Sequence, residues 1–120
     1  TVLCPSAPCE TGALLIGRAV SPTKVVILPT PIIISTAFVD EASKHRAAEK
    51  RFRFASPCKG SGCRNWTGQK CKVPEETLSV LPPLDDRLPD CGIRNDCRWF
   101  TQDGALACSV CVQVTTQRDY

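Results

Sequence analysis

Residues 57–71 read PCKGSGCRNWTGQKC, and residues 90–111 read DCGIRNDCRWFTQDGALACSVC. These two stretches hold seven of the nine cysteines in the 120-residue chain, and the other two lie in CPSAPC at residues 4–9. A chain of this length forms one ordinary domain. Only 6% of its residues are aromatic and it has no methionine, so its core is modest. A small core favours additional staples from metal ions or disulfides, and the cysteines therefore decide the fold class.

The number of cysteines and the start of the chain both favour reduced thiols. An odd number leaves one cysteine unpaired in any scheme built only of disulfides. The first residues lack the basic segment, apolar run and small-residue cleavage site of a secretory signal. We therefore expect a cytoplasmic protein, because the cytosol keeps thiols reduced. A secreted disulfide-rich domain remains an alternative, since a mature secreted form would also lack its signal.

The spacing of the cysteines predicts thiolate ligands to metal. Structural zinc sites usually take their ligands from C-x2-4-C pairs, but here the short two-residue gap occurs only between Cys108 and Cys111. Wider gaps suit cysteines that bind different iron atoms of one cluster. We therefore expect one or two iron–sulfur clusters, of the 4Fe-4S type, with zinc as the alternative. The candidate ligands are Cys4, Cys9, Cys58, Cys63, Cys71, Cys91, Cys97, Cys108 and Cys111.

Nine cysteines allow two sites of four ligands, with one cysteine left over. We expect Cys4 and Cys9 to join cysteines of residues 91–111, although the sequence is compatible with many other groupings. Glycines at 60, 62 and 68 let the backbone wrap closely and direct N–H groups at sulfur. The pattern therefore predicts cluster loops, without deciding which cysteines share a site.

Arginines and tryptophans follow the cysteines closely. The arginines would offset thiolate charge and tune a reduction potential, while the tryptophans would exclude water. Filling of the core explains the tryptophans equally well. The candidate cofactor-binding residues are Arg64, Trp66, Arg94, Arg98 and Trp99.

The net charge of +3 assumes neutral thiols. A cluster with four thiolates carries about −2 when oxidised, so two clusters would bring the chain to roughly −1. The basic excess is therefore explained by charge compensation, and we do not expect a nucleic-acid partner. We expect no membrane span either, because prolines 29 and 31 interrupt the longest apolar stretch, at residues 25–34.

The remaining sequence predicts a small α+β scaffold. We expect a proline-stiffened loop over residues 1–12 and a β-hairpin from strands at 13–20 and 24–28. Residues 32–34 either extend the second strand or form a short third one. A capped amphipathic helix is expected from 36 to 51. Residues 72–90 are proline-rich and predict a spacer with at most one turn near 75–80. Alternation after Cys111 predicts a final strand over 112–116.

The fold class is thus a cysteine-rich, metal-stapled single domain spanning 1–120. Residues 1–56 would form the hairpin-plus-helix scaffold with one cysteine pair, and residues 57–111 the main, loop-rich cysteine lobes. His45, the single histidine, is interpreted as a solvated helix residue.

Residues 51–54 read RFRF, which predicts a strand with both phenylalanines on one side and both arginines on the other. Interleaved cations and aromatics can bind single-stranded nucleic acid. We favour a strand whose phenylalanines enter the core while the arginines stay in water or pair with acids. A third interpretation has these arginines balancing thiolate charge, because Cys58 follows directly.

These features favour a small iron–sulfur protein that transfers electrons or serves as an accessory subunit of a larger redox enzyme. Its partner would be a redox protein or a larger enzyme. The first alternative is a zinc-stapled interaction module, and the second is the secreted disulfide domain. No catalytic residue is assigned, because the lone histidine has no evident nucleophile to activate.

Overall fold

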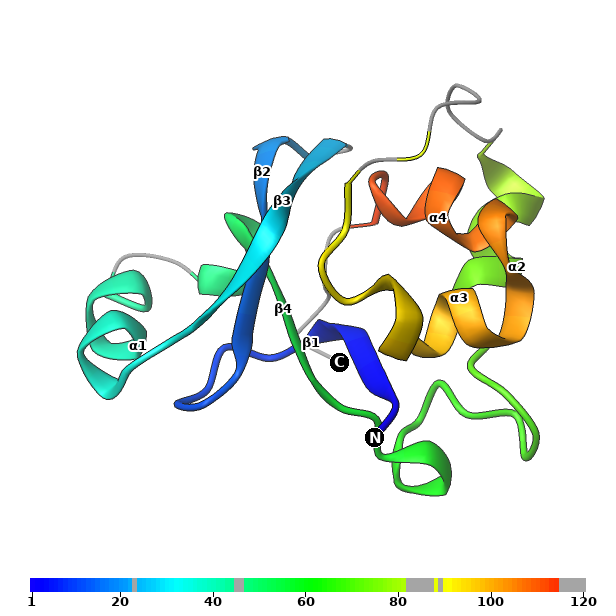
Figure 1. Cartoon of the computed structure of the whole chain (residues 1–120), viewed down its shortest axis with the longest axis horizontal. Helices are drawn as coiled ribbons and strands as arrows, with labels where there is room; N and C mark the ends of the chain where they lie inside the picture. The colour runs from blue at the N-terminus through cyan, green and yellow to red at the C-terminus, as the bar shows by residue number, and fades with distance from the viewer. Residues whose placement is uncertain (23, 45–46, 82–87, 89, 115–120) are drawn as a thin grey trace.

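A four-stranded antiparallel sheet with strand order β1-β4-β2-β3 organises the chain, as the computed structural model shows (Figure 1). The structure describes residues 1–22, 24–44, 47–81, 88 and 90–114. The strands are β1 (Leu3–Ala7), β2 (Leu14–Ser21), β3 (Lys24–Ile33) and β4 (Phe52–Pro57). The α-helices are α1 (Thr36–Ala42), α2 (Val73–Val80), α3 (Arg98–Asp103) and α4 (Ala105–Cys111), and short 3-10 turns span Ala48–Lys50, Gly60–Gly62 and Arg94–Asp96.

The predicted hairpin is confirmed. β2 and β3 pair antiparallel from Leu14↔Ile33 to Ser21↔Lys24. β3 runs to Ile33, through Pro29 and Pro31, so residues 32 and 33 extend the second strand and do not form a third. The prolines are tolerated because β3 is an edge strand. On its outer side there is no neighbouring strand among the described residues, so a residue without an N–H costs no hydrogen bond there.

The predicted loop over residues 1–12 is wrong for its first half. β1 forms the opposite edge of the sheet and pairs with β4 through Leu3↔Pro57, Cys4↔Ser56 and Ala7↔Phe54. Pro5 fits for the same reason as the prolines of β3. The proline-based expectation of a loop overlooked that an edge strand accepts proline.

The predicted helix over 36–51 is confirmed only at its start. The Ser35 hydroxyl accepts a hydrogen bond from the Phe38 N–H at 3.2 Å and caps α1. The helix ends at Ala42, whose carbonyl accepts a hydrogen bond from the Arg51 guanidinium. A hydrogen bond from a returning segment thus satisfies this helix end. The expectation for His45 lies outside the described residues.

The second half of the chain is more helical than predicted. The spacer contains α2, which accommodates Pro74 in its first turn. α3 and α4 occupy residues 98–111, where loops were expected, and Gly104 joins them with a positive φ of 70°. Residues 112–114 do not form the predicted strand, and 115–120 lie outside the described residues.

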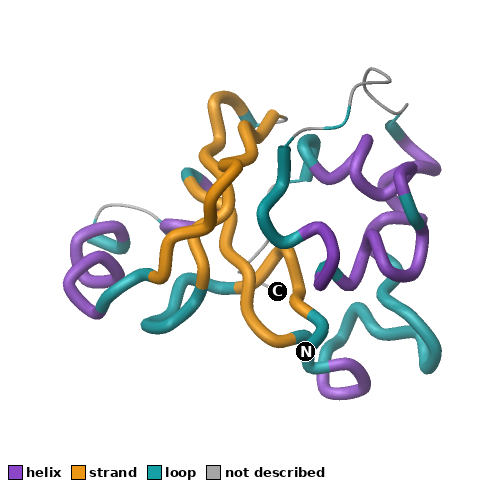
Figure 2. Tube along the Cα trace, in the orientation of Figure 1, coloured by secondary structure: helices purple, strands orange, loops and turns teal. Residues whose placement is uncertain are grey.

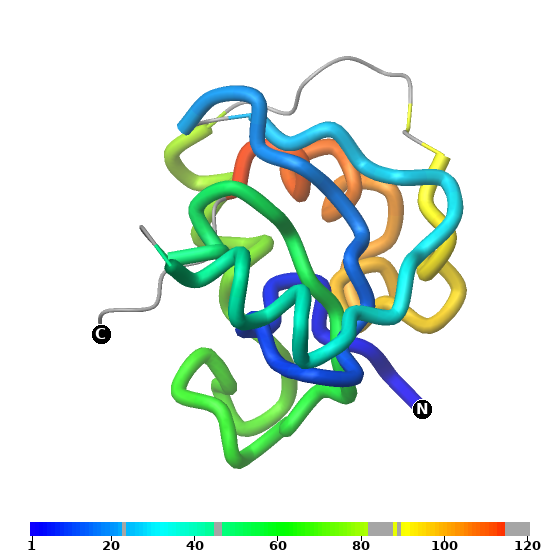
Figure 3. The backbone as a smooth tube through the Cα atoms, turned by 90° about the vertical axis from the view of Figure 1, so that its left-hand side faces the viewer, coloured from blue at the N-terminus to red at the C-terminus, as the bar shows by residue number. Residues whose placement is uncertain are grey.

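The two faces of the sheet carry separate cores, because side chains alternate along β4. Phe52 and Phe54 pack with Phe38 of α1 on one face, at ring-centroid distances of 5.6–6.2 Å. On the other face Ala55 packs with Trp99 of α3 and Ala107 of α4. Figure 2 shows helix α1 on one side of the strands and the three later helices on the other, and the turned view in Figure 3 shows α1 crossing in front of the sheet.

No helix in the described ranges is both long and apolar enough to span a membrane.

Candidate functional site: two cavities with four cysteines each

Eight of the nine cysteines line two cavities on the helical side of the molecule. The first, cavity A, has a volume of about 380 Å³ and is lined by one set of four. The second, cavity B, has a volume of about 20 Å³ and is lined by the other set. The site A cysteines are Cys4, Cys58, Cys63 and Cys71. The site B cysteines are Cys91, Cys97, Cys108 and Cys111.

Strand register brings Cys4 to the other site A cysteines. Cys4 lies opposite Ser56 across the β1–β4 pair, two residues before Cys58. The Cys58 N–H donates a 2.8 Å hydrogen bond to the Val2 carbonyl, which continues the pairing beyond the strand end. The sequence separation of more than fifty residues is therefore closed by a single antiparallel ladder. This differs from the expected grouping of Cys4 with cysteines of residues 91–111.

The loop after Cys58 directs backbone N–H groups at sulfur. The Gly60 N–H donates to the Cys58 Sγ at 3.4 Å, and the Asn65 N–H donates to the Cys63 Sγ at 3.4 Å. Gly60 has a positive φ of 54°, which a residue without Cβ adopts at no steric cost. The loop can therefore stabilise charge on both sulfurs, since N–H donors favour thiolate over thiol.

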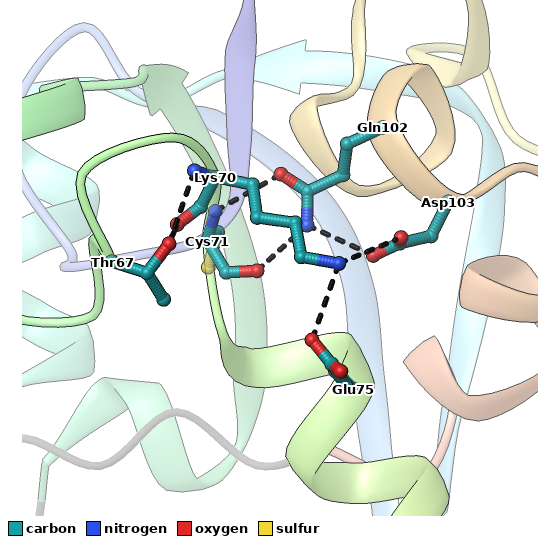
Figure 4. A network of polar contacts seen from close by, with 6 residues as sticks. All are labelled: Thr67, Lys70, Cys71, Glu75, Gln102 and Asp103. Atoms are coloured by element: carbon teal, nitrogen blue, oxygen red, sulfur yellow. Dashed lines mark hydrogen bonds and ion pairs between the residues drawn. The ribbon is translucent and has the colours of Figure 1, made fainter.

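Gln102 of α3 holds the backbone of Cys71 at both ends (Figure 4). The Cys71 N–H donates to the Gln102 Oε1 at 3.0 Å, and the Gln102 Nε2 donates to the Cys71 carbonyl at 2.7 Å. The same Nε2 donates to Asp103, which also lies 3.7 Å from the Lys70 ammonium. These contacts anchor the fourth site A cysteine to α3.

Trp99 forms a wall shared by both cavities. It is 1% exposed, and its indole N–H acts on the Cys71 thiol, where it lowers that thiol's pKa against the larger effect of burial. The indole therefore favours the thiolate form of Cys71. Trp66 lines cavity A, with the Arg98 guanidinium 5.1 Å from its ring centroid.

Site B is built on α3 and α4. Cys97 precedes α3, while Cys108 and Cys111 lie one turn apart on α4. Gly92, next to Cys91, lies against β3, where a Cβ would come within 2.8 Å of the Pro29 carbonyl oxygen. Cavity B has room for about one water molecule, so a larger group would require its four cysteines to move apart.

Arg53 of β4 is buried beside site B, although its strand was expected to leave its arginines in water or paired with acids. Its Nη2 donates to the Cys111 Sγ at 3.2 Å and to the Pro5 carbonyl at 2.7 Å. Its Nη1 donates to the Cys111 carbonyl at 2.7 Å and to the Val114 carbonyl at 2.9 Å. The arginine thus also caps the end of α4, where a cation is favourable.

Burial raises the pKa of four of the cysteine thiols. It raises the pKa of both Cys4 and Cys97 to about 11 and also raises the pKa of Cys71. It raises the pKa of Cys108 as well, although the hydrogen bond and charge of Arg94 act against that rise. These thiols are therefore protonated at neutral pH without metal, and a bound metal would have to displace the protons.

Cys9 stands apart from both sites. It is buried in the other core with Ala13 and Phe54, and its N–H donates to the Glu49 carboxylate at 2.8 Å. None of the nine cysteines, all within the described residues, forms a disulfide. In the same described ranges, no three His, Cys, Asp or Glu side chains converge as ligands of one metal ion. Metal binding by the nine cysteines therefore stays a prediction.

All five candidate cofactor-binding residues line one of the cavities. Arg64, Trp66 and Arg98 line cavity A, Arg94 lines cavity B, and Trp99 lines both. The sequence analysis missed Gln102, for which no local pattern gives a signal. For Arg53 it favoured contact with water or acids, whereas the guanidinium lies beside the Cys111 sulfur; charge balance near a thiolate stays a prediction.

No family model, curated protein or solved structure matches this chain.

Proposed function

We propose that the protein binds one or two iron–sulfur clusters of the 4Fe-4S type and uses them to transfer electrons, the first at site A and a second at site B only after the site B cysteines move apart. It acts either as a small electron carrier or as an accessory subunit of a larger redox enzyme. The observation that carries the proposal is the division of eight cysteines into two sets of four around two cavities. Four thiolates are the ligand set of one such cluster.

The surroundings of site A support a cluster over a single ion. Zinc–sulfur bonds of about 2.3 Å place four thiolates only about 3.8 Å apart, which leaves no cavity between them. The site A cysteines line a cavity of about 380 Å³. The backbone N–H groups of Gly60 and Asn65 also donate to sulfur, and the buried Trp99 indole acts on the Cys71 thiol. Zinc remains the alternative occupant, in an interaction module.

With four cysteines at each site, every iron of a cluster has a protein ligand. Such a cluster exchanges electrons without binding substrate, and the protein sets its potential through hydrogen bonds, charge and burial. The partner is accordingly another redox protein or the enzyme of which this chain is a subunit. Thiolate ligands are kept reduced in a reducing compartment, which supports a cytoplasmic location as part of the proposal.

The test is analysis of iron and acid-labile sulfide in anaerobically reconstituted protein, together with its visible and electron paramagnetic resonance (EPR) spectra. We expect about four irons per chain from a cluster at site A, and about eight where site B opens to hold a second. Replacement of a site A ligand (Cys63→Ser) should remove the site A iron, and replacement of a site B ligand (Cys108→Ser) should remove only iron beyond the first four. A colourless protein with zinc and no sulfide would overturn the proposal.

The matched control is Cys9→Ser, because Cys9 lies in the opposite core and lines neither cavity. This variant should keep the full iron and sulfide content. Loss of iron from the Cys9 variant equal to that from Cys63→Ser would contradict the assignment of ligands.

A further inference from the structure

Arg98 is a partly buried cation on the wall of cavity A. It is the first residue of α3, and the ion pairs formed by the described residues do not include it. Its Nε–H is buried and donates to no acceptor among the described residues. A buried donor on a cationic side chain is costly when it has no acceptor. The wall of cavity A therefore favours an anion that can accept this hydrogen bond.

The Trp66 side chain holds the Arg98 guanidinium beside the site A loop. The guanidinium lies over the indole ring, 5.1 Å from its centroid, where a cation is attracted to the ring face. Trp66 is in turn tied to two site A cysteines through its backbone. Its N–H donates to the Cys63 carbonyl at 3.1 Å, and it forms an antiparallel bridge with Cys71. The position of Arg98 is thus coupled to the loop that carries these two cysteines.

Arg98 differs from the other charged groups around cavity A in its burial. Among the described residues, the cations that line this cavity are Lys59, Arg64 and Arg98, and the first two are exposed. Water and salt screen exposed charges strongly and buried charges much less. The hydrogen bonds already made to the site A sulfurs come from the neutral backbone N–H groups of Gly60 and Asn65. Arg98 is therefore the charged donor whose effect inside cavity A is screened least.

We propose that Arg98 donates its buried Nε–H to the cluster at site A and raises the reduction potential of that cluster, with Trp66 as the positioning residue. This inference rests on the proposed function at site A and requires no metal at site B. Reduction by a one-electron donor adds one negative charge to the cluster, and no bond forms or breaks. A charge-assisted hydrogen bond strengthens as its acceptor becomes more negative, so it stabilises the reduced form more than the oxidised form.

The test is a redox titration with dithionite as the reductant and EPR as the readout. It uses reconstituted Cys108→Ser protein, in which site A holds the iron. Adding Arg98→Gln should lower the midpoint potential, so that the ratio of reduced to oxidised cluster at a fixed potential falls by about tenfold or more. Arg98→Lys keeps the charge but not the Nε–H and should give a smaller fall. Trp66→Leu should also give a smaller fall, because the guanidinium loses the ring that positions it.

The matched control is Lys59→Gln, which removes one positive charge from an exposed position on the wall of the same cavity. Its midpoint potential should stay close to that of the parent protein, because solvent screens the Lys59 charge. Two results would overturn the inference: a potential unmoved by Arg98→Gln, or an equal shift in the Lys59→Gln and Arg98→Gln proteins. A purely structural role for Arg98 would change stability and leave the potential in place.

Pulsed EPR of the reduced Cys108→Ser protein, which retains Arg98, decides the question if the Arg98 variants do not fold. With arginine isotopically labelled at its guanidinium nitrogens, the cluster signal should show a nitrogen hyperfine coupling. That coupling should persist when Arg64→Gln removes the other arginine from the wall of cavity A. Its absence would overturn the inference. Protein that binds no iron at site A would instead contradict the proposed function itself, before any titration begins.

Discussion

At the scale of single residues, β4 shows how one alternating tetrapeptide serves both faces of the sheet. The predicted strand is confirmed from Phe52 onward, with Phe52 and Phe54 in the α1 core. The preferred expectation that the arginines stay in water or pair with acids is wrong for Arg53, which is buried among carbonyl oxygens and a sulfur. Alternation predicted the side of the sheet correctly for residues 52–54 and wrongly for Arg51, which precedes the strand and hydrogen-bonds the Ala42 carbonyl at the end of α1. Alternation could not predict what covers that side of the sheet.

The Gln102 side chain supplies a residue-scale prediction. Gln102→Leu removes the two hydrogen bonds that pair with the Cys71 N–H and carbonyl, and also the bond to Asp103, whose carboxylate keeps its ion pair with Lys70. Because each bond to Cys71 contributes about 1 kcal/mol, we expect the free energy of unfolding to fall by about 2 kcal/mol. Iron should also be released faster from site A than from site B. Denaturant titration and timed iron release to a chelator measure the two effects.

The matched control is Thr101→Ala, at an exposed position of the same helix. Its stability should stay within about 0.5 kcal/mol of the parent protein. An equal loss of unfolding free energy in the two variants would mean that the stability of α3 as a whole matters, and not the hydrogen bonds between Gln102 and Cys71.

At the scale of elements, the close approach of the Cys91 loop to β3 joins the two halves of the chain. Gly92 lies so near β3 that a Cβ would collide with the Pro31 ring and the Pro29 carbonyl. The Val25 N–H donates a 2.6 Å hydrogen bond to the Val112 carbonyl, which ties the same strand to the end of α4. β3 therefore supports site B from outside the cysteine-rich segments.

We expect Gly92→Ala to lower the stability by about 1–3 kcal/mol, because the added methyl group must push the loop away from the strand. Thermal unfolding monitored by circular dichroism measures the loss. Asn95→Ala, an exposed position in the same loop, is the control and should be nearly neutral. A Gly92→Ala variant as stable as the control would show that the loop yields without cost.

At the scale of the whole molecule, the two cores depend on the proposed metal to different extents. The core around Phe54 and Ala48 contains no site A or site B cysteine, whereas the core around Trp99 contains or contacts Cys71, Cys91, Cys97 and Cys111. Metal-binding energy is folding energy for the segments that supply the ligands. Loss of the clusters should therefore destabilise the core around Trp99 before the core around Phe54.

Hydrogen exchange of loaded and metal-free protein tests this prediction. Amides of residues 57–71 and 91–111 should lose protection when the clusters are removed, while paired amides of β2 with β4 should keep most of theirs. The reference is the β2–β4 ladder of the same sample, so no second protein is needed. A uniform loss of protection across both regions would contradict the prediction.

Local chemistry sufficed for several parts of the fold. The hairpin, the Ser35 cap and the strand that begins at Phe52 follow from patterns within a few residues, and all three are confirmed. Helices α3 and α4 were missed, because the density of cysteines over residues 91–111 obscured a weak helical signal. The long predicted helix ended early because Arg51, outside the helix, hydrogen-bonds the Ala42 carbonyl.

The sequence alone determined the α+β class and indicated that cysteines, arginines and tryptophans lie close together. The reason is that a cation and an apolar ring near a cysteine both suit a thiolate site. Only the tertiary structure decided which cysteines share a cavity, that Cys9 belongs to neither, and that Trp99 separates the two sets. The physical reason is that the grouping depends on strand pairing. In the β1–β4 pair Cys4 lies opposite Ser56, and this register brings it close to Cys58. Spacing along the chain contains no information about that register.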